Sequence, residues 1–265
     1  MKTSKTKVTC SFYGKIKSKP FKSFKSLENT NIILYEIFLP EYYNLIKYSS
    51  NYLESFEIKR AENYFKEKDK QRFIVCRILL KCVLAIHTNL DIKKIHINLH
   101  KNKKPYLSSH PELFFNISHS ENCAIIAIAN TPIGVDIESI NKNFDFQEIL
   151  PNIYSKKEIT LINNSIDKNF DFYNLWTRKE AFVKASGKGI DDDFPNINCL
   201  DGLNILKSSI TNSKTPWLIH SFKINKDYIG AVAYTSQSSI PRNLSFLTLP
   251  KNVNDLQILV KKHII

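Results

Sequence analysis

Several residue types are scarce in this chain of 265 residues. It holds six glycines, one methionine and two tryptophans, and its cysteines form no CxxC pair. The sequence therefore predicts neither a glycine-rich low-complexity block nor a framework of disulfides or zinc ligands. We expect reduced thiols in a cytoplasmic protein at all five cysteine positions: Cys10, Cys76, Cys82, Cys123 and Cys199.

Long hydrophobic runs are also missing. The longest purely apolar stretch runs from Ala124 to Ala129, which is far short of the ~20 residues that a membrane helix needs. The basic N-terminus has no apolar core of the kind found in a secretory signal. We therefore expect no membrane segment, and we expect residues 1–25 to form a flexible extension.

Acidic residues are outnumbered, because 38 lysines and arginines face 25 aspartates and glutamates, a net charge of +13. Such a surface attracts anions, which include nucleic acid, acidic proteins and phosphorylated cofactors. No RRM, KH, zinc-finger or helix-turn-helix signature is present, and the lysines are dispersed. We expect no nucleic-acid partner, although tight, salt-dependent binding of nucleic acid would favour that rival function.

Hydrophobic periodicity predicts an order of strand, helices and strands that occurs twice. It favours an α+β fold with two similar halves, residues 26–131 and 132–265. A helix is expected at 54–87, with a break at 65–69, and further helices at 155–164, opened by a Ser-x-x-Glu capping box, and at 171–186, ended by a glycine. Strands are expected at 31–39, 94–99, 123–129, 133–140, 203–210, 217–225 and 228–235.

Two carboxylates lie two residues apart on the expected strand 133–140. Asp136 and Glu138 would leave the same face of the strand, about 7 Å apart at Cα. Such a pair is repulsive unless a cation lies between the two groups, and oxygen ligands suit Mg²⁺ or Ca²⁺ better than zinc. An exposed polar strand face would explain the pair equally well.

A third carboxylate lies within the apolar face of the expected helix 171–186. Glu180 falls one turn after Trp176, and Lys184 follows one turn later. A Glu–Lys pair at this spacing is often only a surface ion pair. A carboxylate among apolar neighbours instead needs a partner such as a metal or another cation. The geometry leaves both interpretations open.

The sequence NISHS interrupts two apolar runs and predicts a polar turn. Its Asn116, Ser118 and His119, together with backbone amides, could hold a phosphate group. Lys103 and Lys104 lie upstream and could reach the same anion. A loop with local hydrogen bonds is the alternative.

Together, the strings KKP, NISHS, IGVDIE and WTRKEAFVK resemble the surfactin-type 4′-phosphopantetheinyl transferase family in order and spacing. That family has a GKP loop, an N-[IVL]-SHS loop, a [VI]-G-[VI]-D-x-[ED] strand and a W-x-x-K-E helix motif that ends in lysine. Asp136 and Glu180 are 44 positions apart, and the family spacing is forty-odd residues. The resemblance covers about residues 55–235.

The resemblance implies a monomeric, single-chain pseudo-dimer with its active site in the cleft between the halves. It implies transfer of the phosphopantetheine group of coenzyme A to a serine of an acidic apo acyl or peptidyl carrier protein, with release of 3′,5′-ADP. The implied cofactor is Mg²⁺, with Mn²⁺ as a substitute. The sequence does not indicate which carrier or pathway is served.

The same resemblance implies roles for individual residues. Asp136, Glu138 and Glu180 would bind the metal, and Asp136, Glu180 and Lys184 would form the catalytic set. Glu180 would accept the proton of the carrier serine, while Lys184 would stabilise the pyrophosphate or protonate the leaving group. Lys103 replaces the glycine of the family's GKP loop. Coenzyme A contacts are implied at Arg60, Lys103, Lys104, Pro105, Asn116, Ser118, His119, Lys179 and Lys184.

Overall fold

The structure, a computed structural model, describes residues 4–21, 31–191, 193–211, 214–236 and 243–262. The strands are β1 (Lys5–Lys15), β2 (Lys19–Pro20), β3 (Asn31–Phe38), β4 (Ile97–Leu99), β5 (Pro105–Leu107), β6 (Phe114–Ser120), β7 (Cys123–Ala129), β8 (Ile133–Ser139), β9 (Gly202–Lys207), β10 (Trp217–Lys223), β11 (Tyr228–Thr235) and β12 (Asn243–Thr248). The α-helices are α1 (Ser49–Tyr52), α2 (Ser55–Glu62), α3 (Glu67–Thr88), α4 (Leu150–Ile153), α5 (Lys156–Asn164), α6 (Lys168–Ser186), α7 (Ser208–Thr211) and α8 (Val253–Lys262). Short 3₁₀ helices are η1 (Leu39–Tyr48), η2 (Ile92–Lys94), η3 (Gln147–Ile149) and η4 (Phe194–Asn196).

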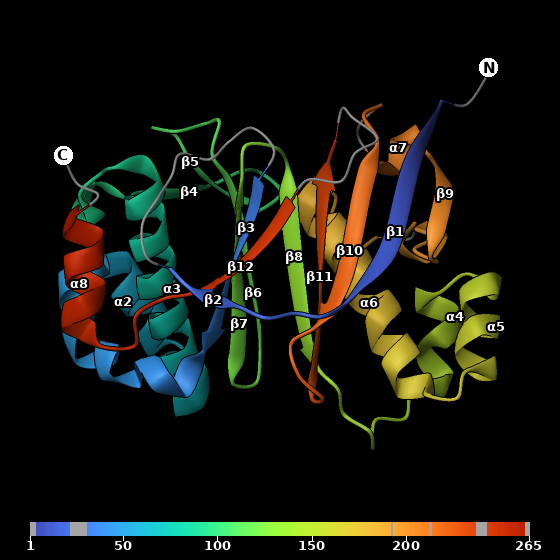
Figure 1. Ribbon diagram of the computed structural model, residues 1–265, viewed down its shortest axis with the longest axis horizontal. Coiled ribbons are helices and arrows are strands. Elements are labelled where there is room, and N and C mark those ends of the chain that lie inside the picture. The colour runs from blue at the N-terminus through green and yellow to red at the C-terminus, as the bar shows by residue number, and fades with distance from the viewer. Residues whose placement is uncertain (1–3, 22–30, 192, 212–213, 237–242, 263–265) are drawn as a thin grey trace.

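Two five-stranded sheets form the centre of the molecule. The β6 sheet has the order β2-β12-β3-β7-β6, and the β8 sheet has the order β8-β11-β10-β1-β9. Helix α3 covers the outer side of the β6 sheet, and α6 covers the outer side of the β8 sheet (Figure 1). A third apolar cluster, which includes Ile125 and Val135, lies between the two sheets. The predicted α+β class is confirmed.

Both halves share one connectivity. A strand, its helices and a hairpin follow one another as β3, α3, β6, β7 and again as β8, α6, β10, β11. In each sheet the last strand pairs antiparallel between the first two, giving β3-β7-β6 and β8-β11-β10. This shared order agrees with the prediction of two similar halves.

The two chain ends exchange between the sheets, which the sequence reasoning missed. Strand β1 lies between β10 and β9, while β12 lies beside β3, so that blue β1 stands among orange strands (Figure 1). Helix α8 likewise packs on the cluster around α3. The C-terminal segment 243–262 therefore joins the first half, not the second.

The expected flexible extension over residues 1–25 is wrong for residues 5–15 and 19–20, which form β1 and β2. Alternate side chains of β1 are buried, namely Thr6, Val8 and Cys10. Lysines at the intervening positions obscure this alternation in the sequence. Residues 1–3 and 22–25 lie outside the described residues.

The remaining element predictions match with small shifts. Strand β7 reads as one apolar run because both of its faces are buried: Ile126 faces the α3 cluster and Ile125 faces the other sheet. The capping box between Ser155 and Glu158 opens α5, and α6 ends at Gly187, whose φ is 70°. Only 97–99 of the expected strand 94–99 is extended. In the described ranges, no helix combines the length and apolarity needed to cross a membrane.

Burial of β1 generates a stability prediction. Val8 is fully buried, so Val8→Ala should lower the free energy of unfolding by about 2 kcal/mol through lost apolar burial and a small cavity. Urea unfolding measures this value. The exposed neighbour substitution Lys7→Gln should stay within about 0.5 kcal/mol of the unsubstituted protein. Equal, negligible effects at both positions would contradict the placement of β1 in the core.

Candidate active site

The segment Asn116–Ser120 is part of strand β6, not the predicted turn. The turn lies at residues 121–122, between β6 and β7. Three polar side chains of β6 reach β8: Asn116 Oδ1 accepts a hydrogen bond from the Val135 amide at 2.8 Å, and the hydroxyls of Ser118 and Ser120 donate to Asp136 and Glu138 at 2.8 and 2.9 Å. Polar residues occur in this strand because their partners lie on the adjacent half. The row of side chains joins the two sheets.

Helix α6 lies directly on β8 because Gly134 has no side chain. A Cβ atom at Gly134 would lie 2.2 Å from the Ala181 carbonyl oxygen and 2.3 Å from the Ala185 amide nitrogen, closer than real contacts allow. The short approach carries Glu180 and Lys184 to the carboxylates of β8. The Lys184 ammonium lies 2.6 Å from Asp136 Oδ1 and 3.8 Å from Glu180 Oε2.

Asp136 is almost completely buried. Its Oδ1 accepts hydrogen bonds from Ser118 and Lys184, whereas no group among the described residues donates a hydrogen bond to Oδ2. Burial raises the pKa of the Asp136 carboxyl above its usual value, and Lys184 opposes this shift. A buried carboxylate oxygen without a partner is costly, so Oδ2 is suited to a cation.

Glu138 follows two residues later and faces the same cavity. Ser120 donates to its Oε2, and the indole Nε1 of Trp176 donates to its Oε1 at 3.3 Å. Burial and the neighbouring Asp136 charge raise the pKa of Glu138. The motif quoted for the family includes Trp176, but the sequence reasoning gave it no role beside Glu138, since that contact spans 38 positions.

Glu180 is the third carboxyl of the site, and its pKa is also raised. Burial raises the pKa of Glu180 to about 7, with smaller contributions from Asp136 and Glu138, and Lys184 opposes the shift. These groups border one cavity of about 340 Å³, hereafter the carboxylate cavity. Its lining consists of Ile117, Ser118, His119, Asp136, Glu138, Trp176, Glu180 and Lys184.

The donor set fits a hard divalent cation such as Mg²⁺. It consists of carboxylate oxygens, which are the ligands that Mg²⁺ prefers. The three carboxylates repel one another, and the Lys184 ammonium is the cation that lies beside Asp136 and Glu180. Asp136 Oδ2 offers a free buried oxygen. In the described part of the chain, no three His, Cys, Asp or Glu side chains converge on one point, since Lys184 lies between Asp136 and Glu180.

His119 lines the carboxylate cavity, and the charge of Arg72 on α3 acts on the His119 ring. Desolvation lowers the pKa of His119, and the Arg72 guanidinium on α3 adds to this effect. Arg72 itself pairs with Asp69 one turn earlier. The sequence reasoning did not select Arg72, because it lies 44 positions before Asn116 and is part of no motif.

Lys103, Lys104 and Pro105 line a second, smaller cavity of about 210 Å³ that shares Glu180 and Lys184 with the first. The backbone of Lys103 is left-handed, with a φ of 63°. This conformation favours glycine, which explains why glycine suits this position of the family's loop. The Lys104 ammonium is bonded to two backbone carbonyl oxygens, of Ile133 and Ala185.

Two of the expected coenzyme A contacts lie elsewhere. Arg60 on α2 packs over the Phe73 ring, with 5.1 Å from guanidinium carbon to ring centroid. Lys179 is fully buried and forms an ion pair with Glu158 at 3.0 Å. Because consecutive helix residues point about 100° apart, Lys179 leaves α6 away from Glu180. The structure therefore places Lys179 in a buried ion pair, and its contact with coenzyme A stays a prediction.

The buried pair leads to a prediction for Lys179. Lys179→Met leaves the Glu158 charge buried without its cation, so the free energy of unfolding should fall by about 3–5 kcal/mol. Thermal and urea unfolding measure it. The double variant Lys179→Met with Glu158→Gln should recover part of the loss. A stable Lys179→Met protein with weakened coenzyme A binding would instead support the original assignment.

The raised pKa of Glu180 predicts a pH-dependent stability. The folded protein holds the Glu180 proton up to about pH 7, whereas the unfolded chain releases it near pH 4.5, so stability falls as pH rises through this window. A shift from 4.5 to about 7 corresponds to about 3 kcal/mol at 1.36 kcal/mol per pKa unit. Glu180→Gln should therefore stabilise the metal-free protein more at pH 8 than at pH 4.

Mg²⁺ provides the second part of this test. At pH 8, millimolar Mg²⁺ should raise the melting temperature of the unsubstituted protein, because a ligand of the folded state stabilises it. The melting temperature of Glu180→Gln should stay nearly unchanged. An equal Mg²⁺ response in both proteins would argue against a cation site at Glu180.

Comparisons with known proteins show the family of this chain. The family described as 4′-phosphopantetheinyl transferase superfamily matches residues 132–233, and the family described as 4′-phosphopantetheinyl transferase, N-terminal, matches residues 42–131. The chain is 28% identical over 195 residues to the 4′-phosphopantetheinyl transferase Sfp of Bacillus subtilis, covering 72% of this chain and 85% of that protein.

Two further relatives come from distant organisms. The 4′-phosphopantetheinyl transferase HetI of a Nostoc species is 30% identical over 144 residues, 52% of this chain and 61% of that protein. The mouse L-aminoadipate-semialdehyde dehydrogenase-phosphopantetheinyl transferase is 27% identical over 149 residues, 51% of this chain and 48% of that protein. The resemblance inferred from the motifs is confirmed, and this chain belongs to the 4′-phosphopantetheinyl transferase superfamily.

Proposed function

We propose that this protein transfers the 4′-phosphopantetheine group of coenzyme A to a serine of an acidic apo acyl or peptidyl carrier protein. The observation that carries the proposal is the grouping of Asp136, Glu138, Glu180 and Lys184 around one cavity between the halves. The serine oxygen forms a bond to the phosphorus on the pantetheine side of the pyrophosphate. The phosphoanhydride bond breaks, and 3′,5′-ADP leaves with the bonding electrons.

Asp136, Glu138 and Glu180 are the residues that would hold Mg²⁺, or Mn²⁺ in its place. When bound, the ion neutralises charge on the pyrophosphate and acts as a Lewis acid. The partnerless Asp136 Oδ2 and the all-oxygen donor set support this assignment. Ser118 and Ser120 on β6 donate hydrogen bonds to two of the three carboxylates, Asp136 and Glu138 on β8. These bonds between the halves orient the proposed ligands.

Glu180 is the proposed general base for the carrier serine. A base is most effective when its pKa lies near the working pH, and burial raises the pKa of Glu180 to about 7. The serine proton would pass to a Glu180 oxygen as the new bond forms. Because Glu180 also faces the proposed cation site, the carboxylate is kept close to the reacting phosphorus.

Lys184, Arg72 and the His119 ring are the proposed contacts of the phosphates. The Lys184 ammonium already lies between Asp136 and Glu180, and His119 lines the same cavity. Lys184 would stabilise the charge that develops on the departing 3′,5′-ADP or give it a proton. The net charge of +13 suits an acidic carrier surface.

The proposal predicts a loss of transfer without loss of fold. Asp136→Ala and Glu180→Gln should each reduce holo-carrier formation by at least ~10²-fold, the scale of general-base and charge-stabilising contributions. The assay combines the protein, coenzyme A, Mg²⁺ and a panel of apo carriers, and reads the mass gain of each carrier. Chelation of the metal should abolish transfer, and added Mg²⁺ or Mn²⁺ should restore it.

The matched control is Asp255→Asn, which removes an exposed carboxylate on α8. It should retain full transfer and a normal melting curve. Near-normal turnover in Asp136→Ala or Glu180→Gln would refute the assigned site. Tight nucleic-acid binding that weakens steeply with salt, without transfer to any carrier, would instead favour the rival function.

A further inference from the structure

The hairpin between β4 and β5 touches the end of the helix that carries Glu180 and Lys184. Leu99 pairs with Pro105 at the base of the hairpin. Within the turn, the Lys103 amide donates to the His100 carbonyl at 2.8 Å, and the His100 amide donates to the Lys104 carbonyl at 2.9 Å. The turn is therefore closed by its own backbone, and the Asn102 side-chain oxygen adds a bond by accepting from the Lys104 amide at 3.2 Å.

Two side chains of this turn bond to the C-terminal end of α6. The Lys104 ammonium donates to the Ala185 carbonyl at 2.5 Å and to the Ile133 carbonyl on β8 at 3.2 Å. The side-chain nitrogen Nδ2 of Asn102 donates to the Gly187 carbonyl at 2.6 Å. The turn belongs to the first half of the chain, whereas α6 and β8 belong to the second. These bonds therefore tie the halves together at the helix end.

The end of α6 is a suitable place for such bonds. The last carbonyl groups of a helix have no partner within the helix, and they form the negative end of its dipole, so a cation there is favourable. Gly187 closes the helix in a left-handed conformation, and a Cβ atom at Gly187 would lie 2.4 Å from the Asn102 side-chain nitrogen. The hairpin is thus seated directly against the helix end.

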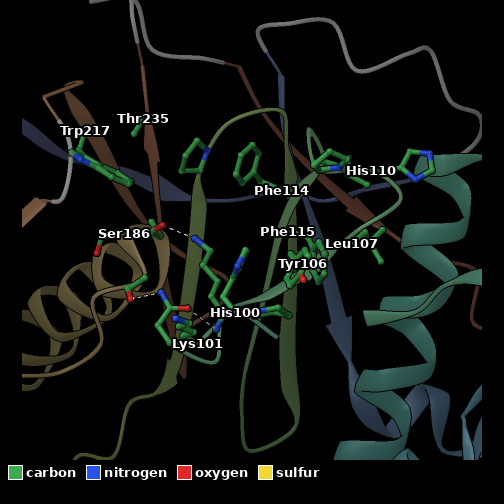
Figure 2. A pocket seen from close by; sticks show the side chains of 18 of the residues that line it. His100, Lys101, Tyr106, Leu107, His110, Phe114, Phe115, Ser186, Trp217 and Thr235 are labelled. Atoms are coloured by element: carbon green, nitrogen blue, oxygen red, sulfur yellow. Dashed lines mark hydrogen bonds between the residues drawn. The ribbon is translucent and has the colours of Figure 1, made fainter. Parts of the chain in front are cut away.

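The end of α6 also borders open space. A cavity of about 990 Å³ is bordered by the hairpin, by residues Ala185–Gly187 and by Trp217. Figure 2 shows this cavity, with Ser186 and Trp217 on one side and Tyr106 and Phe115 on the other; the dashed lines mark the hydrogen bonds between the residues drawn. Beside the packing of Ala185 on Gly134, the bonds from the hairpin therefore help to fix the position of the helix end.

We propose that the 100–105 turn is a clamp on α6 and that Lys104 is a positioning residue for Glu180 and Lys184. This inference rests on the proposed transfer reaction. Lys184 is the immediate neighbour of Ala185, and Glu180 lies about one turn earlier on the same helix. A small displacement of the helix end would therefore move both groups relative to Asp136.

Lys104 is poorly placed to act mainly as a grip for the 3′-phosphate of coenzyme A, the role that the family resemblance implies. Its ammonium already has two carbonyl partners, and its desolvation lowers the pKa of Lys104 to about 8. The two roles predict different kinetics. A phosphate grip acts on substrate binding, whereas a clamp acts on the geometry of the reacting groups.

The experiment compares Lys104→Met with Lys101→Met, an exposed lysine of the same turn. Each variant is assayed with an apo carrier that the unsubstituted protein modifies, using coenzyme A and 3′-dephospho-coenzyme A. For Lys104→Met we expect kcat to fall about tenfold or more, the scale of a small misplacement of reacting groups, by a similar factor for both substrates and with little change in KM. Lys101→Met should be unaffected, and Lys104→Arg should recover part of the activity.

Amide hydrogen exchange gives a readout that does not depend on activity. Exchange in residues 181–187 should become faster in Lys104→Met and, to a smaller extent, in Asn102→Ala, but not in Lys101→Met. If the unsubstituted protein modifies no carrier, the proposed function fails, while the exchange data still test the clamp. Unchanged exchange in both clamp variants, or a rise in KM confined to coenzyme A and absent with the dephospho form, would overturn the clamp.

Discussion

The hydrogen bond between Ser118 and Asp136 is the contact on which the site depends. It crosses from β6 to β8 and therefore from one half of the chain to the other. A carboxylate as deeply buried as Asp136 needs partners to remain charged. The side-chain partners of Asp136 are Ser118 on β6 and Lys184 on α6. Neither half contains a complete site alone.

The excess of negative charge in the carboxylate cavity explains how the same site can handle an anionic substrate. Three carboxylates with upward-shifted pKa values face a single lysine. On its own, such a cavity would repel a pyrophosphate. A divalent cation changes the sign of the local field and relieves the carboxylates at the same time. The same side chains on β6, β8 and α6 thus join the two halves, form the proposed cation site and face the substrate.

The sequence predicted the elements that carry the site better than the contacts between them. Strand β8 and helix α6 have strong periodicity and clear end signals, so Asp136, Glu180 and Lys184 could be placed on the correct elements. The segment 116–120 was assigned to a turn because its polar side chains suggest solvent. Their actual partners lie on β8, and a pattern within one strand does not reveal what the opposite strand offers.

The residues that the structure places differently from expectation have equally specific causes. Lys179 stands next to Glu180 in the motif, but a helix separates neighbours by about 100°, and the partner Glu158 lies on another helix 21 positions away. Strand β1 was missed because its buried residues alternate with lysines, and its partner strands β9 and β10 lie about two hundred positions later. Long-range pairing of this kind leaves no trace in local periodicity.

Lys103 shows how the backbone and the side chain of one position can have separate consequences. The left-handed backbone at residue 103 is the conformation that glycine adopts most easily, and the closing bonds of the turn are present with lysine in this place. The shape of the turn, and with it the reach of Asn102 and Lys104 to α6, is therefore kept despite the substitution. What lysine adds is a cationic side chain that borders the same small cavity as Glu180 and Lys184. The departure from the family's glycine thus leaves the contact with the helix intact and changes the charge beside the reacting groups.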